Sequence, residues 1–383
     1  MELTDRTTFT TKLHGGYCPK WLFKRMKNLA KPLIQLIIEE YGTKEVLSRL
    51  SDPLYFQAFS NVLGYDWNSS GTTTVLCGVL KETLSPAMGI LVAGGKGKMS
   101  LRTPQEIRRI GKCFGLSTKR ISGLVEASKK VAKVDNAVLQ DHHTLYHHSF
   151  FITKGGSWAV VQQGMNPQRK SARRYHWTGE DLESFVLDPH RGIEGTYALD
   201  RVLNLPSRKS LQVQRTSVDL IKEGVDRVKR DVGTLKRKRK GIPPLTRYVS
   251  PEQPPKKPGN PKVQTVDFKV TWDRLPWGKI EEAYELQPRN FEDLMQIRGI
   301  GPKTMRALAL VSELIYEAEL SWEDPVRYTF AHGGKDGIPY PVQTDRMTEV
   351  HDFLQKTLEE SSIGRDAKKK VLKRLAKFST SQK

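Results

Sequence analysis

Cysteine is scarce in this sequence of 383 residues. Only Cys18, Cys77 and Cys113 occur, far apart and odd in number. A disulfide framework needs cysteines in pairs, and a cysteine site for zinc or an iron-sulfur cluster needs them closely spaced. The sequence supports neither kind of scaffold and favours a reducing compartment.

Long hydrophobic runs are also missing. No stretch reaches the roughly 20 apolar residues that span a bilayer as a helix. The first residues carry Glu2, Asp5, Arg6 and Lys12 among threonines, in place of the apolar core of a signal peptide. We therefore expect a cytoplasmic protein with no membrane partner.

Acidic residues are outnumbered by basic ones, with 42 Asp and Glu against 63 Lys and Arg and a formal net charge of +21. Each phosphate that a protein neutralises releases condensed counterions, so such an excess favours a polyanionic partner such as DNA. A generally basic, solvated surface would give the same charge. The partner must therefore be sought in the motifs.

Apolar residues recur with helical spacing along much of the chain. From Trp21 to Ile37 they come every three or four residues, with Lys and Arg between them. Pro32 is expected to kink or divide this helix, because proline removes a backbone hydrogen bond. Further helices are predicted at residues 52–64, 69–84, 103–114, 117–133 and 217–232.

Strand signals are confined to a few segments. Tyr146–Ile152 and Ser157–Gln163 are rich in β-formers and flank Thr153-Lys154-Gly155-Gly156, which is typical of a hairpin. The short apolar run Met88–Val92 is interpreted as a loop. The predicted fold class is α+β, mostly helical, with a small sheet that contains this hairpin in the N-terminal half.

Charge and proline content suggest a linker in the second half. Lys236–Lys240 is a continuous basic run, and Pro251–Pro261 contains five prolines. We divide the chain into an α+β domain at 1–205 with the candidate catalytic residues, a charged helix and Lys/Pro-rich linker at 206–265, and a helical domain at 266–383.

The segment Leu294–Leu310 matches a helix-hairpin-helix pattern in length, polarity and glycine placement. Gly299 and Gly301 permit turn angles barred to other residues and let a phosphate approach the main chain. Pro302 suits the first turn of a helix, where free N–H groups at the positive helix end can hold an anion. The predicted DNA-binding residues of this turn are Arg298, Gly299, Ile300, Gly301, Lys303 and Thr304. An ordinary tight helical corner would use the same glycines.

A second group of residues could carry chemistry. Asp135 and the run Asp141–His148 place six carboxylate or imidazole groups within fourteen residues. On a strand, His147 and His148 would face opposite sides. The hairpin could bring His190 nearby. The candidate catalytic residues are Asp135, Asp141, His147, His148 and His176, and the candidate DNA-binding residues beside them are Arg173 and Arg174.

A metal-dependent phosphodiesterase holds a divalent ion with carboxylates and imidazoles and orients a water molecule with a base. Asp141 and His147 are the predicted ligands of such an ion, Mn²⁺ or Mg²⁺. The alternative is structural: the histidines hydrogen bond inside a packed hairpin, and Asp141 caps a turn.

Several separated strings resemble one family. They are Leu13–Gly16 with Trp21-Leu22, Leu145–Phe150, Val160–Asn166, Ala172–Trp177 and Ala331–Gly337. Together they are similar to the mainly archaeal family catalogued as domain of unknown function 763, over nearly the whole chain. The resemblance implies a DNA-processing role, as a nuclease that acts on single-stranded or branched DNA with a divalent metal, in repair or recombination.

Two other functions remain open. The turn at Ile297–Thr304 also looks like the hairpin of base-excision DNA glycosylases, with Lys303 as the nucleophile and Asp324 as the candidate aspartate. A non-enzymatic DNA-binding accessory protein would use the histidine region only as structure. The long amphipathic N-terminal helices leave room for a homodimer.

Overall fold

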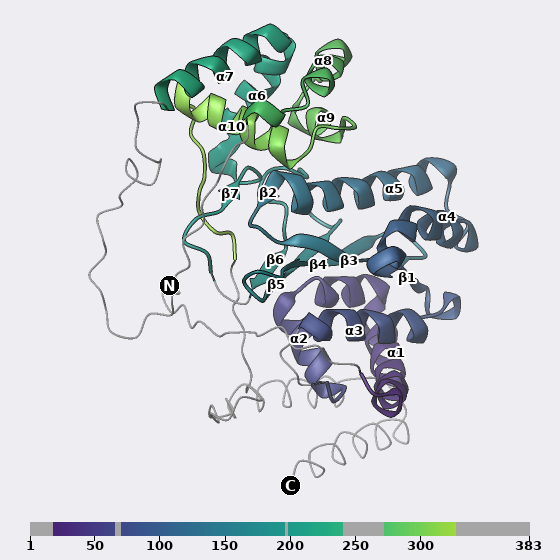
Figure 1. Cartoon of the computed structure of the whole chain (residues 1–383). Coiled ribbons are helices and arrows are strands. Elements are labelled where there is room, and N and C mark those ends of the chain that lie inside the picture. Colours follow the sequence, from purple (N-terminus) through teal and green to yellow (C-terminus); the bar gives the residue numbers. More distant parts are fainter. Residues whose placement is uncertain (1–17, 66–69, 196–197, 240–271, 327–383) are drawn as a thin grey trace, which may run out of the picture.

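A computed structural model describes residues 18–65, 70–195, 198–239 and 272–326. Its centre is a five-stranded sheet with helices on both faces (Figure 1). The fold is mixed α+β and mostly helical, as predicted.

Three helices cover one face of the sheet. They are α1 (Lys20–Leu50), α2 (Pro53–Val62) and α3 (Ser70–Thr83). The backbone of α1 stays helical through Pro32 and departs from helical angles only at Gly42, where φ is 82°. Of the two outcomes predicted for Pro32, a kink or a division of the helix, the division is wrong: the break lies at Gly42, where glycine can adopt a positive φ.

The sheet is antiparallel throughout, in the order β1-β3-β4-β5-β6. The strands are β1 (Ile90–Lys96), β3 (Thr144–Thr153), β4 (Trp158–Asn166), β5 (Ser171–Thr178) and β6 (Gly192–Gly195). The hairpin is confirmed as β3 and β4. The loop interpretation of Met88–Val92 is wrong, because Ile90 begins an edge strand that pairs with β3, and its partner lies some sixty residues later.

The opposite face of the sheet is covered by α4 (Thr103–Cys113) and α5 (Thr118–Lys133), followed by a short π-helix, η3 (Val134–Val138). A two-stranded pairing of β2 (Leu139–Gln140) with β7 (Leu203–Asn204) continues this layer. The sheet thus separates two hydrophobic cores. Phe151 and Val161 belong to the core beneath α1–α3, whereas Phe150 and Val160 belong to the core beneath α5.

Five more helices extend the second core (Figure 1). They are α6 (Leu211–Lys222), α7 (Val225–Arg239), α8 (Trp277–Leu286), α9 (Phe291–Gln296) and α10 (Pro302–Tyr316). The single helix predicted at 217–232 is divided into α6 and α7, since Gly224 has φ 97°. Short 3-10 turns complete the described chain at η1 (Pro86–Met88), η2 (Gly97–Arg102), η4 (Arg208–Ser210) and η6 (Trp272–Arg274).

Several predictions fall on residues outside the described ranges: residues 240–265 of the linker segment, residues 327–383 of the C-terminal domain, and the resemblance strings Leu13–Gly16 and Ala331–Gly337. Within the described ranges, no helix is both long enough and apolar enough to cross a membrane.

Candidate functional site

The histidines of β3 point to opposite faces of the sheet, as predicted. His148 lies on the α5 face, where its imidazole bonds to Ser128 of α5 and to Gln162 of β4, at 2.9 and 2.5 Å. Its neighbour His147 lies on the α1–α3 face and bonds to Ser149 at 2.9 Å. The two imidazoles therefore cannot serve one site.

Asp135 is fully buried on the α5 face and is surrounded by donors. Its carboxylate accepts from Gln162 Nε2 at 2.5 Å, Trp177 Nε1 at 2.9 Å and His190 Nε2 at 2.5 Å. Burial raises the pKa of Asp135, and the bonds from His190 and Trp177 oppose that rise. His190 thus reaches the candidate cluster, and Asp135, Gln162 and His148 form one continuous hydrogen-bonded chain.

Asp141 lies in a second buried group on the same face. It accepts from the His143 amide at 3.0 Å, Arg173 Nη1 at 3.2 Å and the Tyr175 hydroxyl at 2.7 Å. Burial by itself raises the pKa of a carboxylate, but the charge of Arg173 and the neighbouring His143 bring the pKa of Asp141 below its usual value. Asp141 is therefore an ionised anchor for Arg173.

Arg173 also holds Asp324 through both guanidinium ends, with Nη1 at 3.0 Å from Oδ1. Asp324 accepts the Leu199 amide as well. In the glycosylase alternative, Asp324 would be the catalytic aspartate that acts together with Lys303. In the structure, the carboxylate of Asp324 is engaged by Arg173 and Leu199.

The α1–α3 face holds Arg174 and His176. Arg174 forms an ion pair with Glu194 and donates from Nε to His176 Nε2 at 2.9 Å, and the other ring nitrogen of His176 donates to the Leu50 carbonyl at 3.0 Å. In place of the predicted DNA contacts, Arg173 and Arg174 are buried and neutralise carboxylates. The strand β5, which the sequence did not reveal, alternates them between the two faces.

His147 differs from the other imidazoles in one respect. Its Nδ1 is buried and has no hydrogen-bond partner among the described residues. Burial, reinforced by the positive charges of Lys96 and Lys81, lowers the pKa of His147 to about 3. The ring is therefore neutral near pH 7, with one nitrogen unsatisfied.

The predicted metal ligands do not converge. Asp141 lies on the α5 face and its oxygens are occupied by Arg173, Tyr175 and the His143 amide, whereas His147 lies on the other face. No group of three or more His, Cys, Asp or Glu side chains in the described ranges is arranged to hold a metal ion. These residues do not fit the divalent ion that the sequence implied.

The glycine turn between α9 and α10 lies at the surface. Gly299 has φ 95°, and Gly301 precedes the first residue of α10 without providing a side-chain cap. Arg298, Gly299 and Lys303 are exposed, whereas Ile300 and Thr304 are buried. The turn therefore presents main chain and cations outward, with its apolar residue inside.

This turn is fastened to the sheet layer by contacts that the sequence did not predict. Lys133 of α5 donates to the Ile300 carbonyl, and Lys130 pairs with Glu292 of α9 at 3.2 Å. Gln140 donates to the Pro302 carbonyl at 2.8 Å and accepts from Arg306 Nε at 2.8 Å. No local signal could have shown these pairs, because their members are more than 160 residues apart.

A family model described as "Protein of unknown function (DUF763)" matches residues 7–342. Comparisons with curated proteins and with solved structures gave no match.

Proposed function

Because the chain belongs to the DUF763 family, whose function is unknown, we propose a function from the site itself: α9, the glycine turn and α10 act as a helix-hairpin-helix element that binds the phosphate backbone of DNA. The observation that carries this proposal is the exposed turn with Gly299 at φ 95° directly before the N-terminus of α10.

The free amides of α10 provide the anion site. The first N–H groups of a helix have no partner within it, and here the first intrahelical bond of the turn comes from Met305 to the Gly301 carbonyl. The amide of the exposed Lys303 is thus left for another acceptor. The helix dipole favours negative charge at the same place.

The side chains beside the turn add charge. Arg298 and Lys303 are exposed and make no ion pair with any described residue. A phosphate held by the amides would lie within reach of both cations, which would strengthen binding without reading bases. The bonds from Lys133 and Gln140 keep the turn in place before DNA arrives, which lowers the entropy cost of binding.

Replacement of Arg298 and Lys303 by Ala tests the proposal. We expect affinity for duplex and single-stranded DNA to fall by about 10-fold at moderate salt, and the slope of log K against log salt to fall by about 2, one for each phosphate that the variant no longer neutralises. The matched control is Lys112→Ala plus Lys119→Ala at the α4–α5 corner, which removes the same charge. Equal binding by the two double variants would refute the proposal.

Gly301→Ala gives a second, independent test. A Cβ at this position meets no atom within 4 Å, and the φ of −119° suits alanine. The fold should therefore be unchanged. The methyl group would occupy the space through which a phosphate approaches, so DNA binding should weaken although the circular dichroism spectrum stays the same.

Hydrolysis of phosphodiester bonds is a second candidate, favoured by His147. The Nδ1 of His147 is buried without a hydrogen-bond partner among the described residues, and Lys81 and Lys96 lie near enough to lower its pKa. Because that lowered pKa makes the ring a weak base near pH 7, we propose that His147 acts in a nuclease by hydrogen bonding and positioning a water molecule or a phosphate oxygen. The assay is cleavage of labelled single-stranded, duplex and flap DNA, with Mg²⁺, Mn²⁺ or chelator.

The His147→Gln variant separates the two roles. The nuclease proposal predicts loss of cleavage with DNA affinity unchanged. Cleavage that persists in His147→Gln, or no cleavage by the wild-type protein in any buffer, would reject it and leave the binding proposal intact.

A further inference from the structure

The first half of α1 presents a basic, acid-free face to solvent. Between Lys20 and Ile38 the sequence has no Asp or Glu, and the first acid is Glu39. The exposed residues of this stretch are Lys20, Trp21, Lys24, Arg25, Asn28, Lys31 and Gln35. Lys20, Lys24 and Lys31 share one side of the helix because their spacings of four and seven residues are close to whole turns.

Trp21 is the most exposed aromatic residue of this surface, with 61% of its area accessible. It stands in the apolar pattern of the sequence, yet the fold does not bury it. The guanidinium of Arg25 lies over its ring, 5.9 Å from the centroid. An indole held in this way offers a flat surface on which a base can stack, next to cations.

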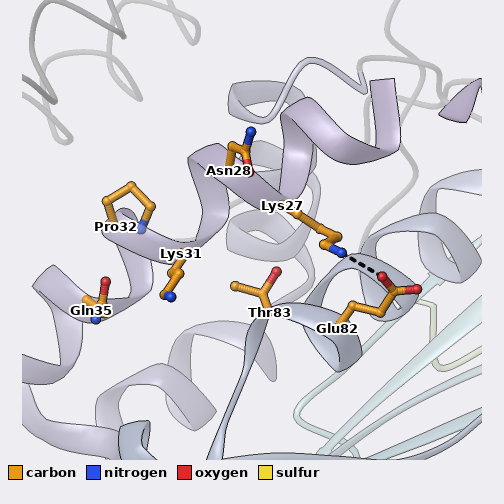
Figure 2. A pocket seen from close by; sticks show the side chains of 7 residues that line it. All are labelled: Lys27, Asn28, Lys31, Pro32, Gln35, Glu82 and Thr83. Carbon is orange, nitrogen blue, oxygen red and sulfur yellow. Dashed lines mark hydrogen bonds and ion pairs between the residues drawn. The ribbon is translucent and has the colours of Figure 1, made fainter. Parts of the chain in front are cut away.

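A depression of about 460 Å³ adjoins the same face, between α1 and the end of α3 (Figure 2). Its lining residues are Lys27, Asn28, Lys31, Pro32, Gln35, Glu82 and Thr83. Lys27 is paired with Glu82 at 2.7 Å, whereas Lys31 makes no ion pair with any residue that the structure describes. Pro32 has no amide hydrogen, so the helical bond to the Asn28 carbonyl is not made.

We propose that this face of α1 is a second nucleic-acid-binding surface, which takes single-stranded nucleic acid with phosphates along Lys20, Lys24 and Lys31 and a base on Trp21. From Lys20 to Lys31 the helix rises by about 17 Å, which is room for several nucleotides of an extended strand. The depression, with Lys31 at its rim, receives one phosphate.

The structure favours a nucleic acid over an anionic membrane. A helix that lies on a bilayer inserts its apolar face. The apolar face of α1, which includes Met26, Leu33 and Ile37, is already buried in the core between the sheet and the helices α1–α3. Within residues 20–38, Trp21 is the one large apolar side chain that is exposed, and six of the seven residues that line the depression are polar or charged.

This inference goes beyond the proposed function, because it does not require the glycine turn. α1 packs on one face of the sheet, whereas α9 and α10 join the layer on the other (Figure 1). The two surfaces therefore contact separate strands, or separate segments of one strand.

Binding of a fluorescent oligothymidylate to the full chain tests the surface. For Lys24→Glu plus Lys31→Glu we expect about 10-fold weaker binding near 0.1 M salt and a shallower salt slope, by about 1.4 if the variant no longer neutralises two phosphates. The control, Lys112→Glu plus Lys119→Glu, makes the same charge change at the α4–α5 corner. Equal losses of affinity in the two double variants would overturn the proposal.

Tryptophan emission gives a readout that charge alone would not change. The oligonucleotide should quench part of the emission of the wild-type protein, and Trp21→Ala should remove that part, whereas Trp21→Phe should keep the affinity. Undiminished quenching in Trp21→Ala would contradict stacking at this position.

Two further experiments distinguish this surface from the glycine turn and from a membrane-binding site. The effect of the Lys24 and Lys31 substitutions should be the same in a Lys303→Ala background, so failure of the glycine turn to bind DNA would leave this result standing. Vesicles of phosphatidylserine and phosphatidylcholine should not compete with the oligonucleotide for the protein. If the vesicles displace the oligonucleotide, and this displacement requires Lys24 and Lys31, the surface is a membrane site.

Discussion

Arg173 stands between two buried carboxylates, and its own side chain is 1% exposed. Removing one partner of a buried ion pair leaves charge without compensation, which costs about 3–5 kcal/mol. Here the loss of one guanidinium would leave both Asp141 and Asp324. We expect Arg173→Met to lower the free energy of unfolding, measured by urea denaturation, by about 3–5 kcal/mol or more.

The matched control is Arg208→Met. Arg208 pairs with Glu183, but their side chains are 62% and 79% exposed. Exposed pairs contribute about 0–1 kcal/mol. If Arg173→Met cost no more than Arg208→Met, the buried network would not stabilise the sheet as its geometry implies.

The burial of His148 predicts that the free energy of unfolding depends on pH in the mildly acidic range. Burial lowers its pKa to about 4 in the folded chain, whereas an unfolded histidine titrates near 6.5. Between these values the unfolded chain binds the proton and the folded chain does not, so stability is complete above about pH 6.5 and falls as the pH decreases toward 4.

His148→Gln keeps a hydrogen-bonding side chain without a titrating group. It should make the free energy of unfolding less dependent on pH between about 6.5 and 4, by up to ~1.4 kcal/mol per pH unit. Urea denaturation at several pH values measures this slope. An unchanged slope in the variant would show that His148 does not titrate as its burial implies.

At the scale of the element, the two glycines of the α9–α10 turn have different tasks. Gly299 has φ 95°, and a Cβ there would lie 2.6 Å from the side chain of Lys279. An L-residue with left-handed angles costs about 1–2 kcal/mol. We expect Gly299→Ala to lower the melting temperature and Gly301→Ala to leave it unchanged, by calorimetry; the reverse order would mean that the turn is built differently.

Sequence periodicity predicts elements well where one face is buried and the segment is long. The helices at 103–114 and 117–133 and the β3–β4 hairpin are confirmed almost at their predicted bounds. β1 and β5 were missed because buried strands do not alternate between apolar and polar residues. Arg173 and Arg174 look like a solvated basic stretch until Asp141 and Glu194, distant in sequence, are placed beside them.

The candidate site shows the same limit. Strand alternation correctly placed His147 and His148 on opposite faces, which is a local property. The partners of Asp135 could not be predicted, since Gln162, Trp177 and His190 come from three separate segments. Trp21 illustrates the converse: helical spacing marks it as a core residue, but the core begins farther along α1, at Met26.

At the scale of the whole molecule, the sheet and the helices α6–α10 share one hydrophobic core. Arg173–Asp324, Lys130–Glu292 and Lys133–Ile300 also cross between them. We expect these parts to unfold in one transition, with the same denaturation midpoint by circular dichroism and by hydrogen exchange at α5 and α10. Two separate midpoints would mean that these contacts do not couple the parts.

The central claim concerns the amides of the glycine turn, and their hydrogen exchange measures it directly. Exchange at residues 299–304 should be followed with and without a short oligonucleotide at moderate salt. The account predicts slower exchange at the exposed residues Gly299 and Lys303 in the complex, and no slowing at this turn in Gly301→Ala. Tight DNA binding with unchanged exchange at these amides would contradict it.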